Sequence, residues 1–144
     1  MNKKVLIKLE NEQDFVENNN SEQISLEFDG EFYEKREKFY LSYNDHSEGL
    51  EGAHTILKID PEAERVLLMR NEPAEMKQDF KIGEKIKGYL NTQYGEIKTS
   101  VKTSSLEIEI EENRGRIKIR YQLYLGGELS SNHYLKLSYD IVED

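Results

Sequence analysis

The sequence predicts an all-β protein whose antiparallel strands close, or nearly close, into a small barrel. Apolar and charged residues alternate with a period of two through most of the chain, as they do in half-buried strands. Turn-forming residues separate these segments at short intervals, and no amphipathic segment of helix length lies between them, which favours a sandwich or a closed barrel over a βαβ arrangement. We therefore expect about eight to ten strands, in a single domain that spans residues 1–144.

The expected strands are short segments in which alternate positions are apolar. Turn signals separate them: Asp60 and Pro61, for example, suit the first two positions of a type I turn. Residues 11–21 lack the alternation, and the triple Asn at 18–20 favours a long connection over a helix. The strands are expected at residues 5–10, 24–28, 39–43, 55–59, 66–70, 75–81, 85–93, 96–102, 106–111, 116–125 and 135–141.

The clearest hairpin joins residues 106–111 to residues 116–121, where apolar residues alternate with Glu on one strand and with Lys or Arg on the other. We predict a turn centred on Asn113 and Arg114, with Gly115 relieving steric strain beside it. In that register the apolar pairs are Ile110 with Ile117, Ile108 with Ile119 and Leu106 with Tyr121. The charged pairs are Glu111 with Arg116, Glu109 with Lys118 and Glu107 with Arg120.

Burial rather than charge should drive this hairpin. Burying one Ile or Leu contributes roughly 1.5 to 3 kcal/mol, whereas one exposed cross-strand ion pair contributes about 0.2 to 1 kcal/mol. A slip of one residue would turn the glutamates into the core, so the alternation excludes it.

Composition excludes several classes of protein. The net charge of −9 would repel nucleic acid and anionic membrane surfaces, so we expect neither as a partner. The absence of cysteine excludes disulfides, thiolate metal sites and a cysteine nucleophile. No apolar run reaches the length of a membrane span, and Lys8 and Glu10 interrupt the first run before it reaches the length of a signal peptide, so we expect a cytoplasmic protein.

Four motifs occur in a fixed order along the chain. They are Tyr-Leu-Ser-Tyr-Asn-Asp at 40–45, Thr-Ile-Leu-Lys-Ile at 55–59, Val-Leu-Leu-Met-Arg at 66–70 and Tyr-Leu-Asn-Thr-Gln-Tyr-Gly at 89–95. Together they resemble the YwiB-like family of bacterial proteins of unknown function, and the resemblance extends over nearly the whole chain. The last motif is the most specific of the four.

The resemblance implies a calycin-like barrel, similar in shape to lipocalins and fatty-acid-binding proteins, and it implies no activity. The chain departs from the family after Arg70, where members often have a Gly two residues later and this chain has Asn71, Glu72 and Pro73. It also contains no Trp, so the Gly-x-Trp signature of lipocalins proper is absent. The resemblance to ligand-carrying lipocalins is therefore limited to the shape of the barrel.

A barrel of this size either is filled by its own side chains or holds one small ligand, so the first candidate site is the interior. Arg70 shares a face with Val66 and Leu68, where its guanidinium could bind a carboxylate or phosphate through two contacts. The alternative is an Arg70 that lies at the end of a strand, solvated or paired with a Glu.

Tyr and Thr side chains are the other candidates for ligand contacts, because each combines a hydroxyl with an apolar part. Ordinary packing explains the same residues, since both types favour strands. The candidate ligand-binding residues are Arg70, Tyr40, Tyr43, Tyr89, Thr92, Tyr94 and Tyr121, and Tyr139 and Thr99 qualify on the same grounds.

Nothing in the chain has the spacing of a metal or catalytic site. His46, His54 and His133 lie far apart, so we expect no metal. The loop at residues 44–52 is rich in oxygen ligands but lacks the spacing of an EF-hand, which favours a solvated hairpin loop. No nucleophile elbow, phosphate loop or dinucleotide motif is present, so we expect no cofactor, and a non-enzymatic role is favoured.

Three functions remain open. The first is the non-enzymatic binding of a small, partly apolar ligand in the barrel interior. The second is a protein-interaction module that uses an acidic face or an open sheet edge. The third is an enzyme with polar residues at the mouth of the barrel, centred on Arg70. The sequence leaves the oligomeric state open, a homodimer included.

Overall fold

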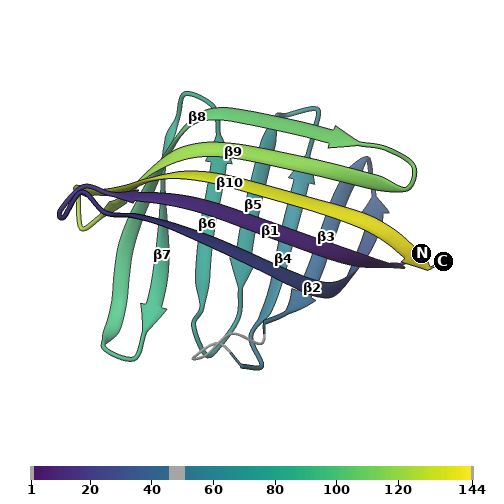
Figure 1. The fold of residues 1–144 in the computed structure, drawn as a ribbon, viewed down its shortest axis with the longest axis horizontal. Coiled ribbons are helices and arrows are strands. Elements are labelled where there is room, and N and C mark those ends of the chain that lie inside the picture. Colours follow the sequence, from purple (N-terminus) through teal and green to yellow (C-terminus); the bar gives the residue numbers. More distant parts are fainter. Residues whose placement is uncertain (1, 46–50, 144) are drawn as a thin grey trace.

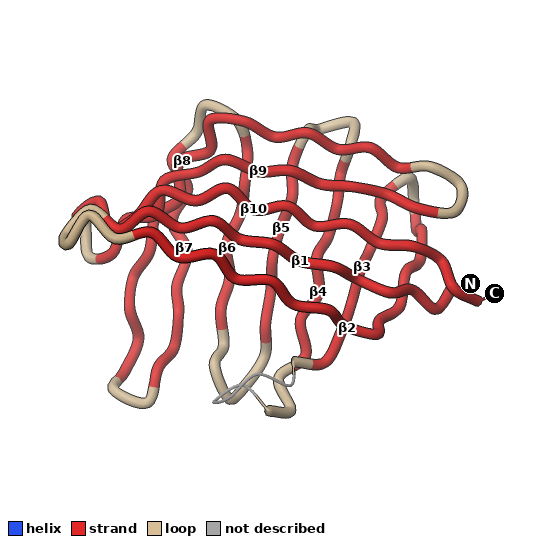
Figure 2. Tube along the Cα trace, in the orientation of Figure 1, coloured by secondary structure: helices blue, strands red, loops and turns tan. Residues whose placement is uncertain are grey.

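The computed structural model describes residues 2–45 and 51–143, and these residues form only strands and loops (Figures 1 and 2). Ten strands make one closed antiparallel barrel in which each strand pairs with its neighbours in the chain, and this confirms the predicted fold class. The end of the last strand lies beside the beginning of the first, which closes the barrel (Figure 1). No helix of the described residues is long and apolar enough to cross a membrane. The strands are β1 (Lys3–Phe15), β2 (Ser21–Lys35), β3 (Lys38–Asn44), β4 (His54–Asp60), β5 (Arg65–Arg70), β6 (Met76–Lys81), β7 (Lys85–Thr92), β8 (Gly95–Ile110), β9 (Arg114–Leu125) and β10 (Glu128–Glu143).

The barrel has two layers whose strands cross (Figure 1). In that view β1, β2, β9, β10 and the later part of β8 form the front layer, and β3 to β7 with the beginning of β8 lie behind. β8 passes between the layers at a bulge between Thr103 and Ser105. β2 passes between them near Gly30, where a Cβ atom would lie 2.4 Å from the carbonyl oxygen of Ser42, so only glycine fits.

Each of these bent strands leaves part of one edge unpaired. Residues 21–29 of β2 pair with β1, but the pairing with β3 begins only at Gly30. Residues 106–110 of β8 pair with β9, whereas the pairing with β7 ends at Lys102. Neither stretch has a second partner strand among the described residues, so the closed barrel keeps two open corners.

Side chains from different walls meet in the middle of the barrel. Phe80 on β6 contacts Tyr121 on β9 edge-to-face, with ring centroids 4.9 Å apart, although these strands are not neighbours. Phe32 on β2 stacks on Tyr139 on β10, with centroids 4.8 Å apart. The centre is therefore packed. The buried apolar residues around it are Val5, Ile7, Phe28, Phe32, Leu41, Tyr43, Leu57, Ile59, Val66, Phe80, Val101, Leu106, Ile117, Ile119, Tyr121, Leu135, Leu137 and Tyr139.

The hairpin between β8 and β9 has a different register from the predicted one. Ile110 faces Gly115 rather than Ile117, so the pairs are displaced by two residues. The turn is closed by the amide of Glu111, which donates to the carbonyl oxygen of Arg114 at 2.8 Å. A displacement of two leaves each side chain on its predicted face, which is why alternation could not detect the error.

Tertiary packing favours the observed register. Gly115 pairs with Tyr139 of β10, and a Cβ atom at residue 115 would lie 2.4 Å from the Tyr139 ring. The glycine therefore makes room for this ring and does not relieve the turn. The ion pairs that form are Glu109 with Arg116, at 3.0 Å, and Glu111 with Arg114, at 2.8 Å.

The long connection predicted for residues 11–21 is wrong. β1 continues to Phe15, whose amide donates to the carbonyl oxygen of Asn20 at 2.8 Å, and a short turn leads into β2. Asn11 and Gln13 occupy inward positions of β1, so the alternation of apolar and polar residues disappears while the strand persists. The segments at 96–102 and 106–111, predicted as two strands, are likewise parts of β8.

Candidate functional site in the barrel interior

The inner surface becomes accessible toward one end of the barrel. Along β5, Val66 is fully buried, whereas Leu68 and Arg70 on the same inner face are half-buried. Arg70 faces Thr55 on β4 and Met76 on β6, so it belongs to a row of inward-facing residues. The guanidinium therefore lies on the inner wall, at the mouth of the barrel.

Four residues at this mouth, Tyr43, Asp45, Thr55 and Arg70, form what we call the Arg70 cluster. The Nε atom of Arg70 donates to the carbonyl oxygen of Ala74 at 2.7 Å. Burial lowers the pKa of Arg70, and the neighbouring Asp45 and Tyr43 oppose that shift. Burial, assisted by Asp45, raises the pKa of Tyr43 to about 12, against the opposing effects of a hydrogen bond with Thr55 and of Arg70. At neutral pH the cluster thus presents a charged guanidinium and a protonated phenol.

A second polar group, the His133 network, consists of Asn11, Tyr121, Ser131 and His133. The Ser131 Oγ atom lies 2.7 Å from Nε2 of His133, and Nδ1 of His133 lies 3.3 Å from Oδ1 of Asn11. Asn11 also hydrogen-bonds Tyr121, whose ring stacks on the imidazole with centroids 4.7 Å apart. Burial lowers the pKa of His133 to about 4, against the opposing charge of Asp14. The imidazole is therefore neutral at pH 7, and its contact with Asn11 Oδ1 assigns the proton to Nδ1.

The His133 network has the contacts of a nucleophile, a base and an orienting group, but a substrate does not reach its hydroxyl. Ser131 is 1% exposed. A reacting carbonyl would have to come within about 3.5 Å of Oγ, and the surrounding walls exclude it. The geometry is that of a buried hydrogen-bond network.

The interior also contains hydroxyls whose hydrogen-bonding capacity is not used. Thr99, Thr103 and Tyr139 have buried hydroxyls with no hydrogen-bond partner among the described residues. Thr103, which is 1% exposed, faces Tyr121 between β8 and β9. A buried hydroxyl without a partner costs about 1–3 kcal/mol. A ligand group or water would relieve this cost.

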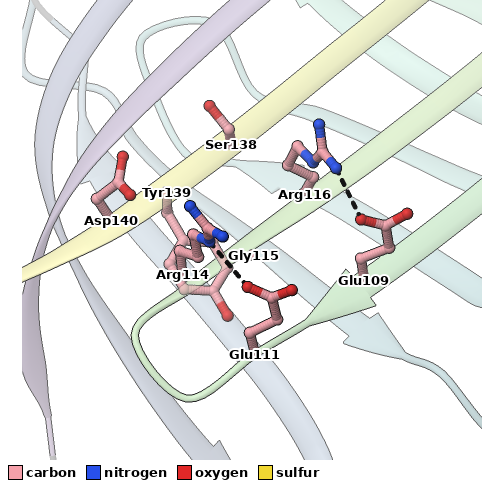
Figure 3. Close-up of a pocket in the computed structure, with 8 residues that line it drawn as sticks. All are labelled: Glu109, Glu111, Arg114, Gly115, Arg116, Ser138, Tyr139 and Asp140. Carbon is pink, nitrogen blue, oxygen red and sulfur yellow. Dashed lines mark hydrogen bonds and ion pairs between the residues drawn. The ribbon is translucent and has the colours of Figure 1, made fainter.

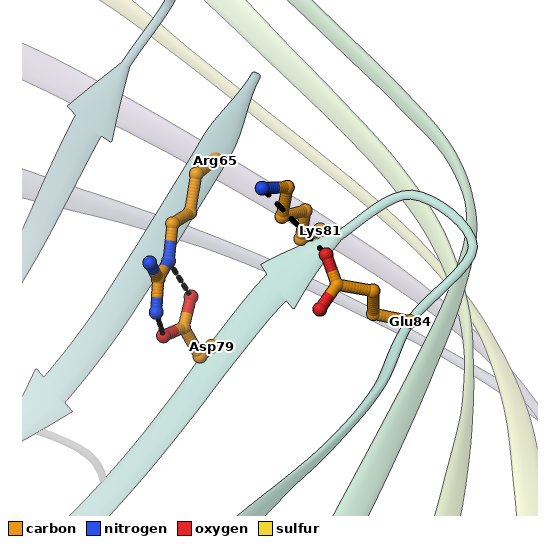
Figure 4. A network of polar contacts seen from close by, with 4 residues as sticks. All are labelled: Arg65, Asp79, Lys81 and Glu84. Carbon is orange, nitrogen blue, oxygen red and sulfur yellow. Dashed lines mark hydrogen bonds and ion pairs between the residues drawn. The ribbon is translucent and has the colours of Figure 1, made fainter. Parts of the chain in front are cut away.

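Several charged residues on the outer wall form ion pairs with each other. A hollow on the outside of β8, β9 and β10 contains Arg114 and Arg116, each in contact with a glutamate (Figure 3). Between β5 and β6, Arg65 donates to both carboxylate oxygens of Asp79, and Lys81 lies 3.6 Å from Glu84 (Figure 4). Arg70 differs from these arginines, because no carboxylate of the described residues lies within ion-pair distance of it.

Only some of the predicted ligand-binding residues come together. Arg70 and Tyr43 are neighbours in the Arg70 cluster, and Tyr121 faces the interior within the His133 network. Tyr40 and Tyr89 lie on the outer wall, where Tyr40 stacks on Tyr33 with centroids 4.7 Å apart.

Thr92 and Tyr94 belong to the turn between β7 and β8. The Thr92 hydroxyl accepts a hydrogen bond from the amide of Tyr94 at 3.1 Å and donates to the carbonyl oxygen of Gly95 at 2.9 Å. Tyr94 itself is 91% exposed. The motif at 89–95 therefore builds a hairpin turn and contributes to neither polar cluster.

The described residues contain no cluster of three His, Asp or Glu side chains that could hold a metal ion. His54 contacts Asn44, with 2.9 Å between Nδ1 and Oδ1. His46 and the middle of the loop predicted at 44–52 lie outside the described residues.

Sequence reasoning does not identify Asn11, Ser131 and His133 as a group. The sequence does show that His133 is a polar residue at an inward position, because it alternates with Leu135 and Leu137 along the same strand. The contact between Asn11 and His133 could not be predicted from the sequence, because the two residues are 122 positions apart and meet only where β10 pairs with β1.

These features define a ten-stranded antiparallel barrel with a packed centre and polar groups on its inner wall. Residues 7–137 match the model of a family described as a domain of unknown function, DUF1934, and the chain belongs to this family. It is 32% identical over 121 residues to the uncharacterized beta-barrel protein YwiB of Bacillus subtilis (strain 168), across 84% of this chain and 83% of that protein. The crystal structure of YwiB from Bacillus subtilis superposes with a TM-score of 0.85 at 26% identity, covering 97% of this chain and 92% of that one. The resemblance to the YwiB-like family is thus confirmed, and the architecture is consistent with a calycin-like barrel.

Proposed function

We propose that this protein binds a small, partly apolar molecule at the mouth of the barrel, with an acidic group of the ligand on Arg70. The observation that carries the proposal is the half-buried guanidinium on the inner wall, which has no ion-pair partner among the described residues. A guanidinium in this setting binds carboxylate or phosphate through charge-assisted hydrogen bonds.

The surroundings of Arg70 suit an amphipathic ligand. Leu68 and Met76 flank the guanidinium on the inner wall and are half-buried, so an apolar part of the ligand can cover them. The protonated phenol of Tyr43 adds a hydrogen-bond donor nearby. The charge of Asp45 acts on the same guanidinium, which favours a singly charged carboxylate over a doubly charged phosphate.

Calorimetric titration with phenylacetate and with neutral phenethyl alcohol tests this proposal. Phenylacetate should bind saturably, and Arg70→Met should weaken it by about 10- to 100-fold, the value of a hydrogen bond to a charged group. Binding of phenethyl alcohol should change little. Arg36→Met, in the exposed turn between β2 and β3, is the matched control and should change neither probe.

Two results would refute the proposal. One is the absence of saturable binding together with no small molecule retained in native mass spectrometry of protein purified without denaturation. The other is binding of phenylacetate that is equally tight in the Arg70→Met variant.

The free edge of β2 supports a second candidate function, the capture of an extended basic segment of another protein. Residues 21–29 lack a strand on one side among the described residues, and Glu27 and Asp29 lie at alternate positions on the outer face of this stretch. A peptide of alternating valine and lysine should bind at low salt in fluorescence anisotropy. Binding that is unchanged in a Glu27→Lys, Asp29→Lys double variant would exclude this candidate.

A further inference from the structure

A hollow on the outer wall lies beside the bulge of β8 and extends over β9 and β10. Its volume is about 380 Å³, within the range of about 300–1,000 Å³ that small-molecule sites have. The extra residue of the bulge, Ser104, borders the hollow, and its hydroxyl donates to the carbonyl oxygen of Arg120 at 3.2 Å. The accessible residues that line the hollow are Lys102, Ser104, Arg120, Gln122 and Asn132, and none of them is acidic.

Two positive charges at this hollow have no carboxylate partner. Lys102 and Arg120 are exposed, and neither forms an ion pair with any of the described residues. Their neighbours differ, because Arg116 on β9 and Lys136 on β10 lie 3.0 Å and 3.9 Å from glutamate oxygens. An anion from solution can therefore reach both charges without breaking an ion pair.

Two tyrosines hold the hydrogen-bond donors of the hollow in place. The guanidinium of Arg120 lies over the Tyr134 ring, 3.7 Å from its centroid, which orients its plane and leaves its N–H groups available. The hydroxyl of Tyr124 donates to Oε1 of Gln122 at 3.3 Å, so the NH₂ group of this amide remains a donor. The hollow thus combines a guanidinium, an ammonium group and an amide.

The surface around the hollow is basic, although the chain has a net charge of −9. Lys85 on β7 faces Lys102 and adds a third positive charge. Asp14 on β1 faces Asn132 from the other side, and its carboxylate accepts a hydrogen bond from the Ser21 hydroxyl at 2.7 Å. Because positive charges outnumber negative ones here, an anion is attracted, and a dianion is attracted more strongly than a monoanion.

We propose that this hollow, which we call the Lys102–Arg120 site, binds the phosphate group of a small phosphate monoester. A phosphate dianion suits the site because both cations act on its charge, and a guanidinium can bind two of its oxygens at once. A small molecule is favoured over a polynucleotide, because the net charge of −9 would repel a polyanion that extends beyond the hollow. The site is independent of the proposed function, since it lies on the outer wall and Arg70 lies on the inner one.

Phenyl phosphate and its singly charged diester, methyl phenyl phosphate, test the site in NMR titrations of the ¹⁵N-labelled full chain. Phenyl phosphate should bind saturably and shift the amide signals of Lys102, Ser104 and Arg120. The diester should bind more weakly, and added salt should weaken the binding of phenyl phosphate. Lys102→Gln and Arg120→Gln should each weaken it about fivefold, the upper value of one exposed ion pair. The amide spectrum of each variant also reports whether the barrel is still folded.

Arg116→Gln is the matched control, because Arg116 lies on the same strand and face as Arg120 but is paired with Glu109. This variant should bind phenyl phosphate as the unaltered protein does, and so should Arg70→Met. The absence of saturable shifts around the hollow would overturn the proposal, as would equal affinity in the Lys102→Gln, Arg120→Gln double variant. Loss of binding in Arg70→Met would place the phosphate at the mouth of the barrel and overturn it too. Tighter binding of oligothymidylate than of phenyl phosphate, at equal phosphate concentration, would overturn the assignment to a small molecule.

Discussion

Replacing Thr103 with Val should make the ligand-free protein more stable. Thr103 is 1% exposed, and its hydroxyl has no hydrogen-bond partner among the described residues. Val has the same β-branched shape, so the packing and the rotamer preference are retained while the cost of burying the hydroxyl disappears. We expect the free energy of unfolding to rise by about 1 kcal/mol, and the melting temperature to rise by about 2–4 °C.

Thr55→Val is the control for this prediction. Thr55 is 2% exposed, and its hydroxyl forms a hydrogen bond with Tyr43, so the same substitution should lower the free energy of unfolding by about 1 kcal/mol. Urea denaturation followed by circular dichroism measures both variants. If Thr103→Val destabilises the protein as much as Thr55→Val does, the Thr103 hydroxyl has a partner in solution and the reasoning is wrong.

Two further predictions concern the interior. Gly115→Ala should lower the free energy of unfolding by about 3 kcal/mol, because the added Cβ would lie 2.4 Å from the Tyr139 ring. A second substitution, Tyr139→Leu, should recover part of this loss in urea denaturation. If nothing is recovered, the clash with the Tyr139 ring is not the cause of the loss. Because burial lowers the pKa of His133 to about 4, its neutral form stabilises the fold fully above the unfolded value near pH 6.5, and this contribution falls as the pH approaches 4. Between pH 7 and pH 5 the protonation of His133 in the unfolded chain should lower the free energy of unfolding by about 2 kcal/mol. His133→Gln should remove this decrease. An equal decrease in the variant would show that other groups cause it.

Local sequence pattern was sufficient for most of the strands and for their faces. Alternation with period two places Ile108, Ile110 and Ile117 on the inner side, and the structure keeps them there. The pattern failed at Asn11 and Gln13, because polar residues at inward positions remove the contrast on which the prediction depends.

The register of the β8–β9 hairpin could not come from the same pattern. Registers that differ by two residues bury the same side chains, so the hydrophobic energy hardly separates them. The structure selects one through a contact outside the hairpin, where the Tyr139 ring of β10 lies against Gly115.

The same distinction between local pattern and tertiary contact applies to the candidate site. Alternation placed Arg70 on the inner face of its strand, which the structure confirms, because the faces of a strand are a local property of the chain. The sequence by itself thus determined most of the strands, their faces and the all-β class. Tertiary structure decided the register, and it decided which polar residues meet, as Asn11 and His133 do when β1 and β10 close the barrel. The physical reason is that contacts between distant strands depend on three-dimensional closure, which no local periodicity encodes.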